Sequence, residues 1–152
     1  MVDSLAFRLL DTHVVAGRAD EPAWLGDGGS LTFAQLLHES ASFAGGLKHL
    51  GVRTGDVVTL DLAGRDRAVA VLALVRLAAV PGPGGSVTIL GTDGAPPVVH
   101  LSEDEVAWDV VRDLGRGDPA PALRTDPDGY EDRLGPEHAD VIDPLLRGEP
   151  LR

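Results

Sequence analysis

The sequence predicts an α/β fold, with a small, mostly parallel β-sheet flanked by helices. Apolar residues recur at helical spacing between residues 33 and 50, and a β-branched run at 57–60 follows a short polar turn. Residues 66–79 are helical in pattern and apolar on nearly every side, so other elements should cover them. Helices and strands that alternate in this way are typical of a parallel sheet with helices packed on it.

A helix and a hairpin are predicted before this region. Asp3 or Ser4 can cap a first helix with leucines and Val14 on one stripe, and Gly17 is placed to end it. Two short apolar segments then flank the glycine-rich turn at 26–29. Because such a turn joins antiparallel strands, we expect a β-hairpin here.

The main helix carries a signal at each end. Thr32 and Gln35 have the spacing of a capping box, in which each side chain accepts a hydrogen bond from the other residue's backbone N–H. Gly51 occupies the position of the left-handed residue that commonly ends a helix. The sequence therefore predicts a helix that starts after Thr32 and ends just before Gly51.

Two further strands and a helix are predicted in the second half. The strands are expected at 87–90 and 98–101, where β-branched residues gather. Ser102 with Glu105 repeats the capping-box spacing and should open a helix that Gly115 closes.

The composition changes after this helix. Residues 116–136 are rich in Pro, Gly and Asp, which predicts an irregular surface segment, and a short helix is expected around 141–146. We therefore divide the chain into an α/β domain over 1–115 and a segment over 116–152 packed on the same domain.

Charge and composition exclude several classes of function. The formal net charge of −11 disfavours nucleic acid or an anionic membrane surface as a partner, because both require a basic face. The chain has no cysteine, so a disulfide, a zinc–thiolate site and a thiol nucleophile are excluded. No secretory signal or membrane-spanning run is visible, and the expectation is a cytoplasmic protein.

A set of spaced positions between residues 4 and 83 forms a recognisable pattern: Leu31-Thr32-Phe33, Leu36, Ala44, Leu47, Gly51-Val52, Gly55-Asp56, Val58 and Ala79-Val80-Pro81. They match an "LTY-x-x-L … A-x-x-L-x-x-x-G-(V/I)-x-x-G-D-x-V" run followed by an apolar helix ending in "G-A-V-x-x-P". In this pattern the region resembles the N-terminal part of the adenylate-forming (AMP-binding) superfamily of acyl-CoA synthetases, luciferases and adenylation domains. These positions determine the fold and do no chemistry. The resemblance implies a small α/β domain like the N-terminal subdomain of acyl-CoA synthetases.

A second segment is similar to the family's phosphate-binding loop, "(T/S)-(S/T)-G-(T/S)-T-G-x-P-K-G-V", but departs from it. The remnant is identified as Gly91, Thr92, Asp93 and Gly94, with Pro97 where the family has its lysine. Such a loop binds phosphate through converging backbone N–H groups, hydroxyls and a cation. An added anion and a lost cation both oppose this, so the loop is degenerate.

The later motifs of the family have no match in this chain. Neither the adenine-binding segment, the ribose-binding aspartate nor the C-terminal catalytic lysine is found, and the sole lysine, Lys48, falls at a position that the family uses for structure. The sequence therefore indicates an N-terminal fragment that is a non-catalytic pseudoenzyme, with no catalytic residue, metal or cofactor.

Three functions stay open at this point. The first is a protein that acts through protein interaction, most simply as a homodimer, because a small sheet fragment exposes surface that a partner can cover. The second is a module that binds a nucleotide or acyl-adenylate through 91–97. The third is a subunit of a split adenylating enzyme that needs a second chain.

Other patterns have simpler structural explanations. His100 with Glu103, Asp104, Glu105 and Asp109 could bind a metal, but acidic residues in the first turn of a helix explain the same cluster. Asp126-Pro127-Asp128-Gly129 lacks the spacing and closing glutamate of a calcium loop and is expected to be a turn. Trp24 and Trp108 are expected to anchor the core or an interface.

Overall fold

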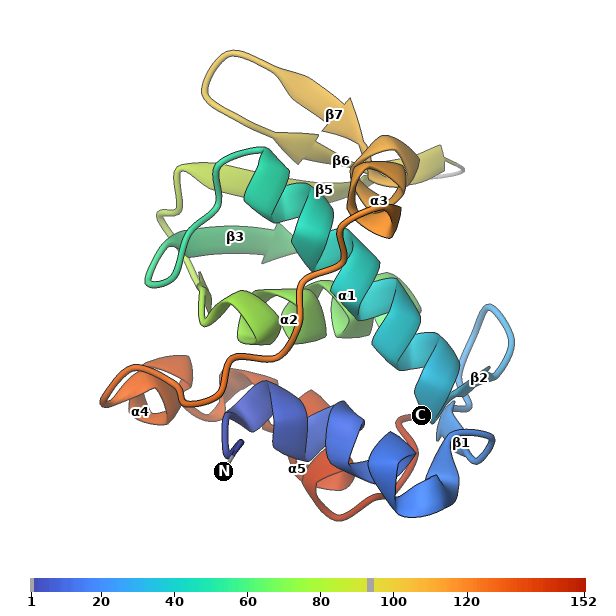
Figure 1. Cartoon of the computed structure of the whole chain (residues 1–152). Coiled ribbons are helices and arrows are strands. Elements are labelled where there is room, and N and C mark those ends of the chain that lie inside the picture. Colours follow the sequence, from blue (N-terminus) through green and yellow to red (C-terminus); the bar gives the residue numbers. More distant parts are fainter. Residues whose placement is uncertain (1, 93–94) are drawn as a thin grey trace.

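The computed structural model describes residues 2–92 and 95–152 of the chain and confirms an α/β fold (Figure 1). Fifteen helical and strand segments are assigned in this part of the chain. In chain order they are η1 (Phe7–Asp11), η2 (Val14–Arg18), β1 (Pro22–Trp24), β2 (Leu31–Thr32), α1 (Phe33–His49), β3 (Val57–Asp61), α2 (Gly64–Leu77), β4 (Val80–Pro81), β5 (Val87–Thr92), β6 (Ala95–His100), β7 (Glu105–Ala107), α3 (Trp108–Arg116), α4 (Tyr130–Leu134), η3 (Pro136–His138) and α5 (Ala139–Leu146).

The main sheet has the order β4-β3-β5-β6-β7 and is mixed. Strand β3 runs parallel to both β4 and β5, as the sequence predicts, whereas β5–β6 and β6–β7 are antiparallel pairs. The predicted, mostly parallel arrangement therefore holds for only half of the sheet. The short hairpin β1–β2 forms a separate two-stranded sheet, also as predicted.

Helix α2 lies at the centre of the molecule, which explains its apolar sequence. Figure 1 shows it between the main sheet and a layer formed by the N-terminal helical segment and α5. An unbroken run of α2 residues, from Ala68 to Leu77, is buried. No helix in the described part of the chain is long and apolar enough to cross a membrane.

The predicted ends of α1 are confirmed. Thr32 Oγ1 accepts a hydrogen bond from Gln35 N (3.1 Å), and Gln35 Oε1 accepts one from Thr32 N (2.9 Å). Gly51 follows the helix with φ of 101°, the left-handed conformation that favours glycine. At the N-terminus, Ser4 is the capping residue, since its Oγ accepts from Phe7 N (3.3 Å).

The second predicted capping box is wrong. Glu105 lies in strand β7, opposite His100 of β6, and the helix starts only at Trp108. Val106 faces Val99 in this register, so a third antiparallel strand covers apolar surface that a helix starting at residue 102 would leave open. Long-range strand pairing therefore overrides the local capping signal.

Helices α1 and α3 approach each other closely through glycines. Gly46 of α1 lies against the carbonyl of Val111, and Gly115 of α3 lies against the carbonyl of Ser42. The prediction that Gly115 ends its helix is wrong, because α3 continues to Arg116 and Gly115 is a contact position. Beside this contact Phe43 stacks on Trp108, with ring centroids 4.0 Å apart. Trp24 and Trp108 are both buried, so both predicted tryptophan anchors lie in the core.

Residues 116–152 run back across the domain. The buried Tyr130 Oη donates a hydrogen bond to Ala79 O (2.6 Å), and Leu5 N donates one to Asp126 Oδ2 (2.8 Å). Burial raises the pKa of Tyr130, so the phenol keeps its proton and the donor role. These contacts join the C-terminal segment to the N-terminal helical segment and to the residues that follow α2.

Candidate functional site

The predicted phosphate loop falls on a β-hairpin. Gly91 and Thr92 are the last residues of β5, and Thr92 is paired with Ala95 of β6; Asp93 and Gly94, the other two predicted residues, lie outside the described residues. In an antiparallel pair the backbone N–H groups are used alternately by the partner strand.

The two prolines after this segment sit at an irregularity of the hairpin. Leu90 is paired with Val98 and Thr92 with Ala95, so β6 has one residue more than β5 between these pairs. Prolines are tolerated at such a bulge because it removes the need for a ladder hydrogen bond. The segment similar to a phosphate loop therefore continues into a bulged strand pair.

Pro97 is buried, and charged groups surround the small cavity beside it. This cavity of about 180 Å³ is lined by Glu39, Arg65, Asp66, Val69, Pro96, Pro97, Trp108, Asp109 and Arg112. Burial raises the pKa of the Asp66 carboxyl, and the nearby Asp109 adds to the effect. A lysine at position 97 would therefore replace a buried residue. Its side chain would lie next to charged side chains that already form ion pairs, such as Arg112 with Asp109 (3.3 Å).

The other candidate clusters have structural explanations. His100 Nδ1 lies 3.4 Å from Glu105 Oε1, as a cross-strand pair rather than on a helix. Within the described ranges, no group of three or more metal-ligating side chains is present. The segment at 126–129 is a turn, as predicted, since Tyr130 N donates to Pro127 O (3.1 Å).

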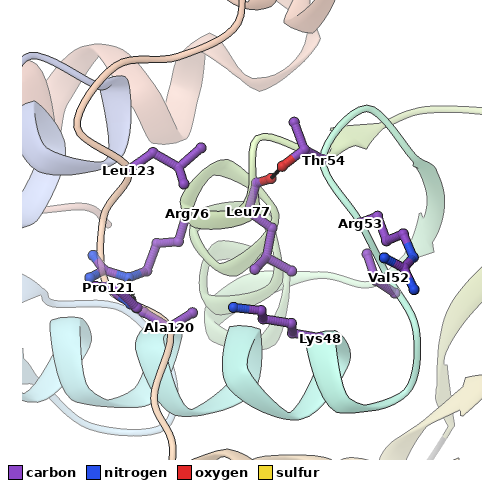
Figure 2. Close-up of a pocket in the computed structure, with 9 residues that line it drawn as sticks. All are labelled: Lys48, Val52, Arg53, Thr54, Arg76, Leu77, Ala120, Pro121 and Leu123. Carbon is purple, nitrogen blue, oxygen red and sulfur yellow. Dashed lines mark hydrogen bonds between the residues drawn. The ribbon is translucent and has the colours of Figure 1, made fainter.

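A hollow lies between the C-terminal ends of α1 and α2 and the segment at 120–123 (Figure 2). Its volume is about 600 Å³, within the range of small-molecule sites. The lining residues are Lys48, Val52, Arg53, Thr54, Arg76, Leu77, Ala120, Pro121 and Leu123. Apolar side chains and three cations line it, and no carboxylate does among the residues that the structure describes.

Arg76 is neutralised inside the protein. It is only 3% exposed, although it interrupts the apolar run of α2. Its Nη1 lies 2.7 Å from Asp11 Oδ1, and its Nε donates to Ala120 O (2.9 Å). The arginine thus fixes the 120–121 segment over α2 and contributes little net charge to the pocket.

Lys48 and Arg53 are different, because their side-chain charges are not paired. Both residues are exposed, and neither side chain forms a hydrogen bond or an ion pair within the described part of the chain. The adjacent helix-end carbonyls are already used: Leu77 O accepts from Thr54 Oγ1 (2.9 Å) and Lys48 O from Gly51 N (3.1 Å). The polar groups left available in the pocket are therefore cationic.

The sequence did not indicate this pocket. In the sequence, Lys48 falls at a position that the resembled family uses for structure, and Arg53 falls in the short polar turn before β3. Arg53 does make that turn, where its N–H donates to Asp56 Oδ2 (2.8 Å). Two basic residues beside apolar ones at 48–53 are only a weak indication of a pocket in the sequence. The opposite wall of the pocket, at 120–123, lies far away along the chain.

Comparison with known proteins places the similarity in the first half of the chain. Residues 11–84 match the family "AMP-binding enzyme". The acetyl-coenzyme A synthetase of Yersinia pestis is 42% identical over 84 residues, covering 51% of this chain and 13% of that protein. The acetyl-coenzyme A synthetase of Rhodopirellula baltica is 38% identical over 86 residues, covering 49% of this chain and 13% of that protein.

The matched region thus spans about an eighth of the length of these curated relatives. Among solved structures, a benzoate CoA ligase from Burkholderia xenovorans is similar, with a TM-score of 0.48 and 28% identity over 53% of this chain and 16% of that one. The family match ends at residue 84, before the β5–β6 hairpin begins.

Proposed function

We propose, because residues 11–84 match the AMP-binding enzyme family, that this chain is a non-catalytic, acyl-CoA synthetase-like protein that acts through protein interaction as a homodimer. The family region supplies α1, β3, α2 and β4, which form the scaffold. Among the matched scaffold positions, the two with reactive side chains have structural roles: Thr32 caps α1 and the Asp56 carboxylate accepts from Arg53 N.

The β5–β6 hairpin is the observation that supports loss of catalysis. It occupies the only segment with a sequence similar to the phosphate loop, and its backbone is paired between strands. The residue at the lysine position is a buried proline, which supplies neither a charge nor an N–H donor. In comparable sites the loss of one preorganised donor costs about 2.7–4 kcal/mol of transition-state stabilisation.

ATP–pyrophosphate exchange with acetate tests this part of the proposal. The purified chain should show no exchange above background, while an acetyl-coenzyme A synthetase assayed in parallel should. Calorimetry should likewise give no heat of binding with ATP or AMP. Exchange by this chain alone would refute the non-catalytic assignment, and saturable nucleotide binding would favour a binding module that uses Gly91 and Thr92.

An apolar stripe on α3 supports the homodimer. Val110 and Leu114 are 51% and 44% exposed and lie one helical turn apart. Large apolar side chains exposed next to each other are typical of interaction surfaces, and a symmetric dimer covers two copies of the stripe at once. Light scattering at micromolar concentration should give twice the chain mass of 15.9 kDa, and a monomer would contradict the proposal.

A second candidate function rests on the similarity to acetyl-coenzyme A synthetases. Because the matched region is only about an eighth of those proteins, this chain could supply the N-terminal part of an adenylating enzyme whose remaining parts come from another polypeptide. Pyrophosphate exchange that occurs only after such a polypeptide is added would select this candidate over the first.

A further inference from the structure

The pocket between α1, α2 and the segment at 120–123 combines an apolar lining with unpaired positive charge. Val52, Leu77 and Ala120 are buried and give it an apolar inner surface. Figure 2 shows Lys48 directed toward Arg76 and the 120–121 segment, with Arg53 on the other side of Leu77. A molecule in the pocket would therefore meet hydrocarbon in the middle and a cation on each side.

Unpaired basic side chains such as Lys48 and Arg53 are unusual in this protein. The chain carries a formal net charge of −11, and the structure pairs many of its basic side chains with carboxylates. Lys48 and Arg53 have no such partner in the described ranges, and no described carboxylate lines the pocket. An anionic group would thus find here two charges that the fold leaves available.

The helix ends beside the pocket do not compete for these cations. The C-terminal carbonyls of a helix carry partial negative charge, and an unpaired carbonyl would attract Lys48. Here Leu77 O accepts from Thr54, Ala78 O from Gly55 N (3.0 Å) and Lys48 O from Gly51 N. The cations are left to interact with an external anion.

We propose that this pocket binds a small amphipathic anion, in which a carboxylate or phosphate head group is attached to an apolar chain or ring. The head group would pair with Lys48 or Arg53, and the apolar part would lie against Leu77 and Leu123. A volume of about 600 Å³ accommodates a ligand of this size. This site is separate from the β5–β6 hairpin and does not depend on the oligomeric state.

Calorimetric titration with four probes tests the proposal. Octanoate and octyl phosphate carry the two possible head groups, inorganic phosphate lacks the apolar part, and octyl glucoside lacks the charge. Saturable 1:1 binding of octanoate or octyl phosphate, at least tenfold tighter than that of either control, is expected. The tighter of the two identifies the head group.

Variants locate the binding. K48A/R53A should weaken binding of the preferred probe at least tenfold, because it removes both free cations. R116A/R147A is the matched control: it lowers the net charge by the same amount, and its exposed arginines do not line the pocket. The control should bind like the wild type.

A third variant, L123E, places a carboxylate on the apolar wall and should also abolish binding while leaving the circular dichroism spectrum unchanged. The proposal is overturned if neither octanoate nor octyl phosphate binds up to millimolar concentration. It is equally overturned if octyl glucoside binds as tightly, or if K48A/R53A binds like the control.

Discussion

Arg76 carries a charge into the core of the molecule, and Asp11 makes this possible. Nη1 of the arginine lies 2.7 Å from Asp11 Oδ1, and the arginine is almost fully buried. Removal of one partner of a buried ion pair leaves an uncompensated charge, whereas replacement of both by apolar groups is often neutral. The pair therefore stabilises the fold mainly by preventing that penalty.

The first prediction follows from this asymmetry. D11A should lower the free energy of unfolding by about 3 kcal/mol in urea titrations, and D11A/R76M should recover most of the loss. D20A, which removes an exposed carboxylate without an ion pair among the described residues, should change it by less than about 0.5 kcal/mol. Equal losses in D11A and D20A would contradict the argument.

The ion pair of Arg67 and Asp140 gives a prediction about pH. Arg67 donates to both carboxylate oxygens (2.7 and 3.0 Å), and this hydrogen bonding lowers the pKa of Asp140 below its ordinary value of 3.8. A carboxyl group with a lower pKa in the folded state stabilises the fold above its unfolded pKa. That contribution is lost as the pH falls through the folded pKa.

D140N should therefore cost about 0.5 kcal/mol at pH 7, a small value because the Asp140 side chain is largely exposed. The difference from wild type should shrink as the pH falls below 3.8 and vanish below the folded pKa. D143N, on the same helix and without an ion pair in the described ranges, should show no such pH dependence. Chemical unfolding at pH 7 and at several acidic values measures both effects.

At the scale of elements, the contact between α1 and α3 requires glycine. A methyl group at Gly115 would collide with the Ser42 carbonyl, which belongs to rigid helix backbone and cannot move aside. G115A should therefore destabilise the protein by about 3 kcal/mol, as overpacking does. Gly117 has φ of −78° and open space around it, so G117A should be within about 0.5 kcal/mol of wild type.

Thermal and urea unfolding of the two variants provide the measurement. Similar stability of G115A and G117A would show that the helices separate easily. In that case the stacking of Phe43 on Trp108, and not the glycine contact, would hold α3 in place.

Local signals predicted the elements well only where the neighbouring structure agreed with them. Thr32 and Gln35 form the predicted capping box, and Gly51 adopts the left-handed conformation. Ser102 and Glu105 have the same spacing, yet Glu105 joins a strand because Val106 pairs with Val99. The deciding interaction is between residues of two antiparallel strands, which capping rules do not include.

At the scale of the whole molecule, the pocket could not be predicted, because its walls come from distant segments. Lys48 and Arg53 lie about seventy residues before Leu123 in the chain, and the segment at 116–136 showed only turn composition. Arg76 brings them together by binding Ala120 O from α2. The scaffold followed from family resemblance, whereas the pocket follows from how the C-terminal segment packs.

The α3 stripe makes a final prediction about the whole molecule, which rests on the proposed homodimer. If two chains associate through Val110 and Leu114, dimerisation stabilises the folded state by mass action. The thermal midpoint of the wild type should then rise with protein concentration. In V110E/L114E, charge at the interface should yield a monomer in light scattering and a midpoint that does not depend on concentration.

V15E is the matched control for this experiment. Val15 is 78% exposed, more than either α3 residue, but it lies on the N-terminal helical segment and has no large apolar neighbour of comparable exposure one turn away. V15E should keep both the dimer mass and the concentration-dependent midpoint. Loss of association in V15E, with a retained dimer in V110E/L114E, would place the interface on the N-terminal helical segment and not on α3. A wild-type midpoint that does not depend on concentration would rule out the dimer.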